Sequence, residues 1–117
     1  MSTPVGPYTP IVRVGDWLIV SGQIGIRDGK LVDGGTGGQL QQALDNLDAL
    51  LKSEGAGPND VVKTTVFLRH MSDYALMNEV YTRYFTDNRP ARSAIAVAEL
   101  PIGALVEIEA WAHTGQR

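Results

Sequence analysis

Two stretches of the chain carry apolar residues at the spacing of a helix face. The first set is Leu40, Ala43, Leu44, Leu47, Leu50 and Leu51, and the second is Leu76, Met77, Val80, Tyr81, Tyr84 and Phe85. The first stripe predicts a helix of about four turns that begins at Gln39 and stops near Gly55. The second predicts a helix that Ser72 or Asp73 caps and that ends before residues 88–90.

Short apolar or alternating runs outside these stripes predict β-strands. They cover residues 11–14, 17–21, 30–32, 61–69, 92–98 and 105–111. The run 61–69 alternates, which places every second residue on the same face of a sheet. One face then carries Val62, Thr64, Val66 and Leu68. Residues 25–38 hold six glycines and are predicted as loop and hairpin, with 34–38 as the hairpin exit.

The order of these elements predicts an α+β fold with two helices on one face of a mixed β-sheet. The 117 residues, of which 44% are apolar, suit a single domain spanning residues 1–117. The second face of the sheet then needs cover, and the small side chains Ala94, Ala96 and Ala98 permit close approach of another surface. Packing of subunits is our hypothesis for that cover.

Charge and cysteine content narrow the classes of function. Ten Lys and Arg against thirteen Asp and Glu give a net charge of −3 with no run of like charges, which disfavours nucleic-acid binding. The absence of cysteine excludes a disulfide framework, a thiolate nucleophile and a cysteine-ligated metal. His70 and His113 are expected at strand ends and lack the spacing of a zinc site, so we assign no metal ligands.

The sequence carries no signal for export or membrane insertion. Residues 1–10 lack the basic start and apolar core of a secretory signal. No apolar run approaches the roughly 20 residues that are needed to span a bilayer. We therefore expect a cytoplasmic protein without a membrane partner.

Charged residues inside predicted strands are the first candidates for chemistry, because an unpaired charge is costly to bury. Arg92 starts a strand whose next three same-face positions are alanines, so its guanidinium is expected beside small neighbours. A planar guanidinium in a cavity suits bidentate capture of a carboxylate. By spacing alone, however, a structural ion pair or a surface position is the commoner role of such an arginine.

Glu107 and Glu109 lie two residues apart in the last predicted strand and therefore share one face. A carboxyl group near apolar surface favours its protonated form, which suits general acid–base catalysis on a bound water. The alternative is a solvated face or pairing with a lysine or arginine. Tyr8 and Ser21 are candidate hydroxyls, although a turn residue and a strand-end hydrogen bond explain them equally well.

Six short segments follow one another along the chain. They are residues 6–8 (GPY), 21–24 (SGQI), 60–68 (DVVKTTVFL), 78–81 (NEVY), 90–93 (PARS) and 106–110 (VEIEA). In this order and approximate spacing they resemble the RidA/YjgF family of reactive-intermediate deaminases. The resemblance extends over nearly the whole chain and is specific as a set.

The resemblance implies a chorismate-mutase-like subunit and a homotrimer, in which the sheets form a central barrel and three clefts lie between subunits. It implies hydrolysis of 2-aminoacrylate and related enamines or 2-imino acids to 2-keto acids and ammonia. Arg92 would bind the substrate carboxylate, and Glu107, rather than Glu109, would position the hydrolytic water. An imine carbon is already electrophilic, so this chemistry needs no cofactor or metal.

The remaining implied site residues surround the substrate. Tyr8 and Ser21 match the family's pocket tyrosine and serine, while Gly22 and Ala94 would contribute backbone groups. Asn78 matches a recurrent family asparagine.

Three features depart from the family pattern. Ala94 stands where many relatives have cysteine, Gly25 replaces the usual proline after residues 21–24, and the connections at 27–30 and 86–90 are short. A backbone role at Ala94 survives its substitution. Changes in these segments can alter the shape of the pocket and the range of substrates.

Two other functions stay open at this point. Relatives have been described as endoribonucleases or translation inhibitors, but a net charge of −3 gives little with which to bind phosphates. A binding protein that holds small carboxylates without turnover is the other alternative. Holding a ligand would require Arg92 but not an acid placed for water, so the pair with Glu107 favours catalysis.

Overall fold

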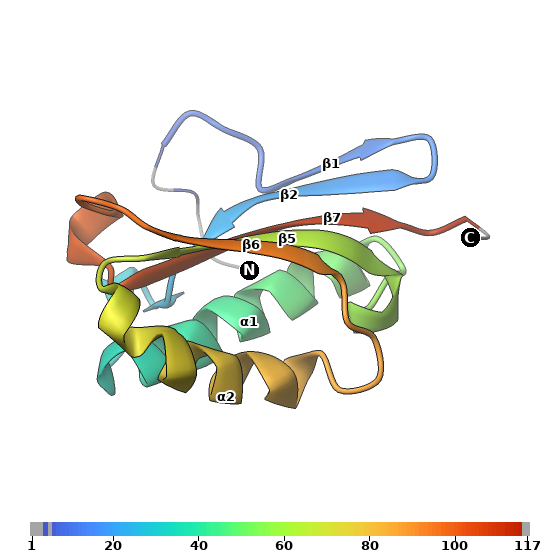
Figure 1. Ribbon diagram of the computed structural model, residues 1–117. Coiled ribbons are helices and arrows are strands. Elements are labelled where there is room, and N and C mark those ends of the chain that lie inside the picture. The colour runs from blue at the N-terminus through green and yellow to red at the C-terminus, as the bar shows by residue number, and fades with distance from the viewer. Residues whose placement is uncertain (1–3, 5, 116–117) are drawn as a thin grey trace.

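A computed structural model gives the fold of residues 4 and 6–115, so the outer ends of the expected 1–117 domain lie outside the described residues (Figure 1). The strands are β1 (Ile11–Val14), β2 (Trp17–Gln23), β3 (Ile26–Arg27), β4 (Lys30–Leu31), β5 (Val61–Leu68), β6 (Ala91–Ala96) and β7 (Val106–His113). The helices are α1 (Gly35–Ser53) and α2 (Tyr74–Tyr84), with short 3-10 turns at Pro58–Asp60, Met71–Asp73 and Pro101–Gly103. Within this part of the chain, each helix falls short of the length and apolarity that crossing a bilayer requires.

The main sheet has the strand order β1-β2-β7-β5-β6, and β3 pairs with β4 in a separate hairpin. All neighbours in the main sheet are antiparallel except β5 and β6, which are parallel. A parallel pair needs a crossover connection, and α2 supplies it between β5 and β6. Both helices lie against the same face of the sheet (Figure 1). The predicted α+β class with a mixed sheet and two helices on one face is therefore confirmed.

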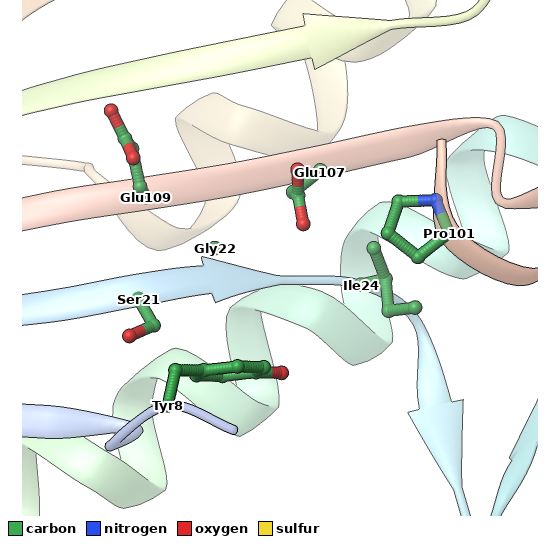
Figure 2. A pocket seen from close by; sticks show the side chains of 7 residues that line it. All are labelled: Tyr8, Ser21, Gly22, Ile24, Pro101, Glu107 and Glu109. Carbon is green, nitrogen blue, oxygen red and sulfur yellow. The ribbon is translucent and has the colours of Figure 1, made fainter. Parts of the chain in front are cut away.

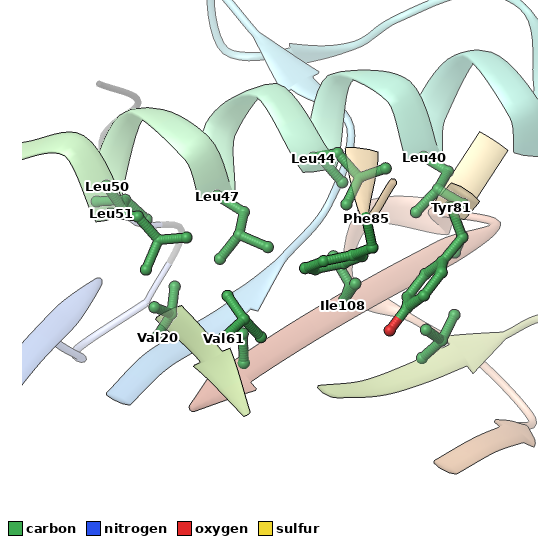
Figure 3. Packing of buried hydrophobic residues seen from close by; sticks show 14 of the residues in the cluster. Val20, Leu40, Leu44, Leu47, Leu50, Leu51, Val61, Tyr81, Phe85 and Ile108 are labelled. Carbon is green, nitrogen blue, oxygen red and sulfur yellow. The ribbon is translucent and has the colours of Figure 1, made fainter. Parts of the chain in front are cut away.

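The hydrophobic core lies between the two helices and the sheet (Figure 3). The residues with no exposed surface include Leu40, Leu44, Leu47, Leu51, Val61, Val66, Leu68, Phe85 and Ile108. The predicted apolar stripe of α1 is thus confirmed, and burial of each such leucine contributes about 1.5–3 kcal/mol relative to an exposed position. The buried hydroxyls of Thr64 and Tyr81 share a hydrogen bond of 2.7 Å, which satisfies both polar groups inside the core.

The prediction that residues 34–38 form a hairpin exit is wrong, because α1 begins at Gly35 rather than at Gln39. Backbone packing explains the difference. A Cβ atom at Gly25 would lie 2.5 Å from the carbonyl oxygen of Gln39, and one at Gly38 would overlap the carbonyl oxygen of Asp33. Glycine therefore lets the first turn of α1 contact the preceding loop directly, which outweighs its low helix propensity.

The second predicted helix is confirmed with a change at its start. Asp73 is the residue that precedes α2, but its side chain makes no capping bond. Instead, its carboxylate accepts a hydrogen bond of 2.6 Å from the Thr36 hydroxyl and so ties the starts of both helices together. Leu76, which we placed in the apolar stripe, is 42% exposed.

The face assignment of β5 is correct for Thr64, Val66 and Leu68, which are buried. It is wrong for Val62. The pairing with β7 shifts between Val61 and Lys63, so Val61 takes the buried position instead. An irregularity of this kind reverses the side-chain alternation on one side of it.

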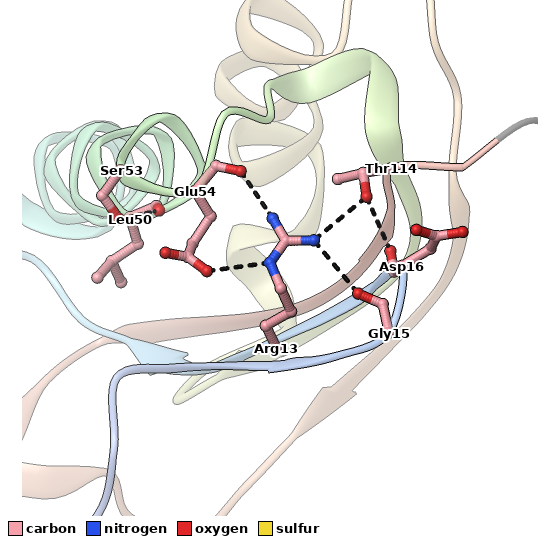
Figure 4. Close-up of polar contacts among 7 residues, drawn as sticks. All are labelled: Arg13, Gly15, Asp16, Leu50, Ser53, Glu54 and Thr114. Carbon is pink, nitrogen blue, oxygen red and sulfur yellow. Dashed lines mark hydrogen bonds and ion pairs between the residues drawn. The ribbon is translucent and has the colours of Figure 1, made fainter.

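Arg13 fastens the outer β1-β2 hairpin to the end of α1 (Figure 4). Its Nε donates to the Glu54 carboxylate over 3.2 Å, and its Nη2 donates to the Glu54 carbonyl oxygen over 2.8 Å. A guanidinium at a helix C-terminus meets the negative end of the helix dipole. Because both side chains are about one third exposed, the ion pair alone adds little stability, and its main effect is to fix the hairpin.

The contact between Gly25 and Gln39 predicts a position-specific loss of stability. Gly25→Ala should lower the free energy of unfolding by about 1–3 kcal/mol, because the added methyl group overlaps the backbone of α1. Gly57→Ala is the matched control, since a Cβ atom there has no neighbour within 4 Å. Urea unfolding at one fixed protein concentration measures both variants, and equal stabilities would contradict the packing role of Gly25.

Candidate functional site

The two glutamates of β7 lie on the sheet face that the helices leave uncovered. Val106, Ile108 and Ala110 alternate with them and are buried on the helix side. This confirms that Glu107 and Glu109 share a face. Both border a cavity of about 320 Å³.

Four segments that are distant in sequence form this cavity (Figure 2). Its lining residues are Tyr8, Ser21, Gly22, Ile24, Pro101, Glu107 and Glu109. Strand β2 lies beside β7, the 3-10 turn Pro101–Gly103 brings Pro101 next to Ile24 at the end of β2, and the segment before β1 places the Tyr8 ring alongside β2. The structure therefore brings together four of the predicted site residues, namely Tyr8, Ser21, Gly22 and Glu107.

Ser21 holds the tyrosine segment against β2. Its hydroxyl donates a 2.6 Å hydrogen bond to the carbonyl oxygen of Thr9, and its amide donates to that of Pro10 over 2.9 Å. The register between β2 and β7 shifts between Val20 and Gln23, and such a bulge redirects side chains at the end of a strand. The hydroxyl oxygen of Ser21 keeps acceptor capacity beside this hydrogen bond.

Gly22 determines where the Glu107 carboxyl group can lie. A Cβ atom at Gly22 would lie 2.7 Å from both Cδ and Oε2 of Glu107. Any larger residue would push the carboxyl group away from the β2 backbone. A glycine at position 22 therefore lets the Glu107 carboxyl group lie against β2. This role adds to the backbone contact with substrate that the family resemblance implies for Gly22.

The environment of Glu107 favours its protonated form. Burial raises the pKa of this carboxyl group above its ordinary value, and the negative charge of Glu109 raises it further. An acid whose pKa moves toward neutrality can both accept and return a proton during one reaction. Glu107 therefore has the protonation behaviour that general acid–base catalysis on a bound water requires.

Arg92 lies in β6, beside Thr64 of β5, and reaches across the sheet edge to α2. Its Nη1 donates to the Asn78 side-chain oxygen over 2.8 Å, and its Nη2 donates to the Tyr74 hydroxyl over 3.0 Å. The guanidinium carbon lies 4.8 Å from the centre of the Tyr81 ring. Among residues 4 and 6–115, no carboxylate pairs with this cation.

Sequence reasoning missed the aromatic partners of Arg92. Tyr74, Asn78 and Tyr81 are spaced at i, i+4 and i+7, which places them on one face of α2. That spacing was the available signal, but Tyr81 was interpreted only as a core residue. Tyr81 is a core residue and also a partner of Arg92, because its ring is buried and one face of the ring lies under the guanidinium.

Arg92 and Glu107 do not meet within one chain. Arg92 aligns with the buried Thr64 and so lies on the helix side of the sheet, whereas Glu107 lies on the other side. The two positions are also two strands and three residues apart, which corresponds to roughly 14 Å between their Cα atoms. Ala94 lies on the same side as Arg92 and packs against the core, so the prediction that its small side chain opens the uncovered face to another surface is wrong.

Arg92 borders a second hollow of about 370 Å³ at the edge of the sheet. Its lining residues are Asn78, Tyr81, Thr82, Arg89, Pro90 and Arg92. The predicted site residues thus fall into two groups, an acidic cavity on one face and a basic hollow on the other side.

The lining of the acidic cavity and that of the basic hollow contain no histidine among the described residues. Within the described part of the chain, no three acidic, histidine or cysteine side chains gather as a metal ion would require. His113 packs its ring 4.8 Å from that of Trp17, and His70 is exposed before the turn that leads into α2.

Comparison with known proteins links this geometry to one family. The family model described as Endoribonuclease L-PSP matches residues 1–114. A 2-iminobutanoate/2-iminopropanoate deaminase of Mus musculus is 47% identical over 113 residues, which are 95% of this chain and 84% of the relative. The crystal structure of RidA from the Antarctic bacterium Psychrobacter sp. PAMC 21119 superimposes with a TM-score of 0.92 at 38% identity, over 95% of this chain and 91% of that one. The crystal structure of the YjgF gene product of E. coli gives a TM-score of 0.90 at 38% identity, over 96% of this chain and 91% of that one.

The pair of acids in the cavity makes a pH-dependent prediction. The pKa of Glu107 should lie above its ordinary value of 4.5, and Glu109→Gln should lower it because a neighbouring negative charge is removed. A carboxyl titration by ¹³C NMR measures both values, with Glu79→Gln on α2 as the control. Since the folded state then holds a proton that the unfolded chain has released, this group makes stability fall as pH rises through the raised pKa. An unchanged pKa in Glu109→Gln would contradict the coupling.

Proposed function

The chain belongs to the RidA/YjgF family, the family of the Endoribonuclease L-PSP model, and from this premise we propose that it hydrolyses reactive enamines and 2-imino acids to 2-keto acids and ammonia. The substrates are 2-aminoacrylate and related compounds that carry a carboxylate beside the imine carbon. Relatives that are 43–47% identical to this chain carry the name 2-iminobutanoate/2-iminopropanoate deaminase, which supports this substrate class.

The single observation that carries the proposal is the unpaired charge of Arg92. The guanidinium is held by an amide oxygen, a hydroxyl and a tyrosine ring, all of which orient it without neutralising it. A structural arginine of an ion pair would have a carboxylate in that place. An oriented cation with free N–H groups instead suits a substrate carboxylate, which forms short charge-assisted hydrogen bonds with such a group.

We propose that the complete site forms between two chains of a homotrimer. Glu107 and Arg92 lie on opposite sides of the sheet, so a small imino acid cannot touch both within one chain. The uncovered face also exposes large apolar side chains, with Trp17 40%, Ile95 46% and Trp111 44% exposed. An apolar patch of this kind is typical of a subunit interface. A neighbouring copy that covers it would bring its own basic hollow toward the acidic cavity of the first.

The proposed reaction needs only water and the two side chains. Arg92 of one chain fixes the substrate carboxylate while the enamine tautomerises to the imine. Glu107 of the other chain takes a proton from a water molecule, whose oxygen attacks the imine carbon. The acid then gives this proton to the nitrogen, which forms a carbinolamine. Glu107 next takes the second proton from the new hydroxyl group and passes it to the nitrogen, so the C–N bond breaks and ammonia leaves as the C=O bond of the keto acid forms. Tyr8, Ser21 and the backbone of Gly22 and Ala94 would hold the substrate during these steps.

The endoribonuclease description of the family model receives less support from the site itself. The cavity contains two carboxylic acids, and the whole chain has a net charge of −3. Binding of a phosphate backbone draws on clustered positive charge. The same protein preparations should therefore also be incubated with RNA, and cleavage that Arg92→Ala or Glu107→Gln abolishes would favour the nuclease function.

Removal of the cation tests the anchoring role. Arg92→Ala should lower kcat/KM for 2-iminobutanoate about a hundredfold, or about 2.7 kcal/mol, mainly through KM, because a charge-assisted contact to the carboxylate is lost. Arg83→Ala, an exposed arginine in the last turn of α2, is the matched control and should stay within about twofold of wild type. Release of keto acid from imine generated in situ is the measurement. Equal rates for wild type and Arg92→Ala would refute the mechanism.

Mixed trimers test whether two chains share one site. Arg92→Ala and Glu107→Gln should each be nearly inactive alone. After unfolding and refolding together at equal concentrations, about a quarter of the sites should combine an intact Arg92 with an intact Glu107, so about a quarter of wild-type activity should return. Each variant refolded separately is the control. If activity does not recover in trimers that sizing shows to be mixed, both residues act within one chain.

A further inference from the structure

The basic hollow beside β6 contains a second arginine that the proposed mechanism leaves unused. Arg89 lies three residues before Arg92, in the connection between α2 and β6, and borders the same 370 Å³ hollow. Its side chain is exposed, and no carboxylate among residues 4 and 6–115 forms an ion pair with it. The hollow thus has two positive charges, and its lining includes no acid.

The residues on both sides of Arg89 fix the position of its backbone. The preceding Asn88 donates from its side-chain nitrogen to the carbonyl oxygens of Pro58 and Val61, over 3.0 and 2.7 Å. The following Pro90 fixes its own φ angle at the start of β6. The connection is therefore anchored on both sides of Arg89, which limits where its exposed side chain can reach.

Both arginines contribute to the lining of one hollow. Burial raises the pKa of Tyr81, while its hydrogen bond to Thr64 and the charges of Arg92 and Arg89 oppose that rise. Tyr81 lines the hollow together with the two arginines, while its hydroxyl is hydrogen-bonded to Thr64 inside the core. Their Cα atoms, three residues apart, are separated by at most about 10 Å.

We infer that Arg89 is a specificity-determining residue that binds a second acidic group, so that the preferred substrates are 2-imino acids with a carboxylate on the side chain. This inference rests on the proposed function and extends it to a substrate class. The carboxylate next to the imine carbon binds Arg92, and the carboxylate at the other end of a four- or five-carbon imino diacid binds Arg89. An uncharged side chain would leave Arg89 without a partner, and the diacid gains the additional charge-assisted contact.

Competition between a diacid and a monoacid substrate tests this inference. The imines of glutamate and of 2-aminobutyrate are generated in situ by amino-acid oxidases, and kcat/KM is measured for each. Arg89→Ala should lower the diacid-to-monoacid ratio about tenfold, whereas Arg89→Lys should retain most of it. Arg83→Ala is the matched control and should leave the ratio unchanged. A ratio that Arg89→Ala does not alter would overturn the inference.

A binding measurement separates this inference from the proposed function. Calorimetry with the stable keto acids 2-oxoglutarate and 2-oxobutanoate should show tighter binding of the diacid to wild type, and Arg89→Ala should abolish that preference. If the monoacid imine is hydrolysed but the preference is absent, the function stands and the role of Arg89 is wrong. If no imine is hydrolysed but the Arg89-dependent preference is present, the diacid site stands and the deaminase function is wrong.

Discussion

The alternation of side chains across a β-sheet is the constraint on which the rest of this structure depends. In β7 it places Ile108 and Ala110 against the helices and therefore sends Glu107 and Glu109 to the opposite face. In β6 the same alternation aligns Arg92 with the buried Thr64 and directs it toward α2. A one-residue slip in either strand would exchange these faces and at once expose core residues. The separation of acid and cation is thus fixed by the same packing that stabilises the fold.

That separation leaves each half of the proposed site chemically incomplete in one chain. Arg92 has neighbours that orient it but no counter-ion in the described part of the chain, and its partial exposure keeps the cost of an unpaired charge low. Glu107 lies against the β2 backbone at Gly22 and beside Glu109, and no lysine or arginine among residues 4 and 6–115 forms an ion pair with it. The positive charge of Arg92 in one chain and the acidic group of Glu107 in another would complement each other. The exposed tryptophans on the uncovered face provide the apolar surface that would hold two copies together.

Much of the fold follows from the sequence, because periodicity reports burial directly. The α1 stripe, the alternation of β5 and the shared face of the two glutamates were all predictable for this reason. The start of α1 was not, since the overlap of Gly25 with Gln39 depends on how two backbones pack in three dimensions. The register shift between Val61 and Lys63 could not be predicted either, because an irregularity in strand pairing leaves no periodic signal in the sequence. For the site, the pattern identified the candidate residues but not their division between two sides of a sheet.

The raised pKa of Glu107 has a further consequence once two chains are brought together. An arginine placed beside a carboxyl group normally lowers its pKa, which would make Glu107 a poorer proton acceptor. In the proposed complex, however, the substrate carboxylate forms the ion pair with Arg92, so the cation is largely neutralised before it can act on the acid. Burial and the negative charge of Glu109 then continue to raise the pKa of Glu107. The substrate's own charge would thereby leave the protonation of Glu107 during hydrolysis to burial and to Glu109.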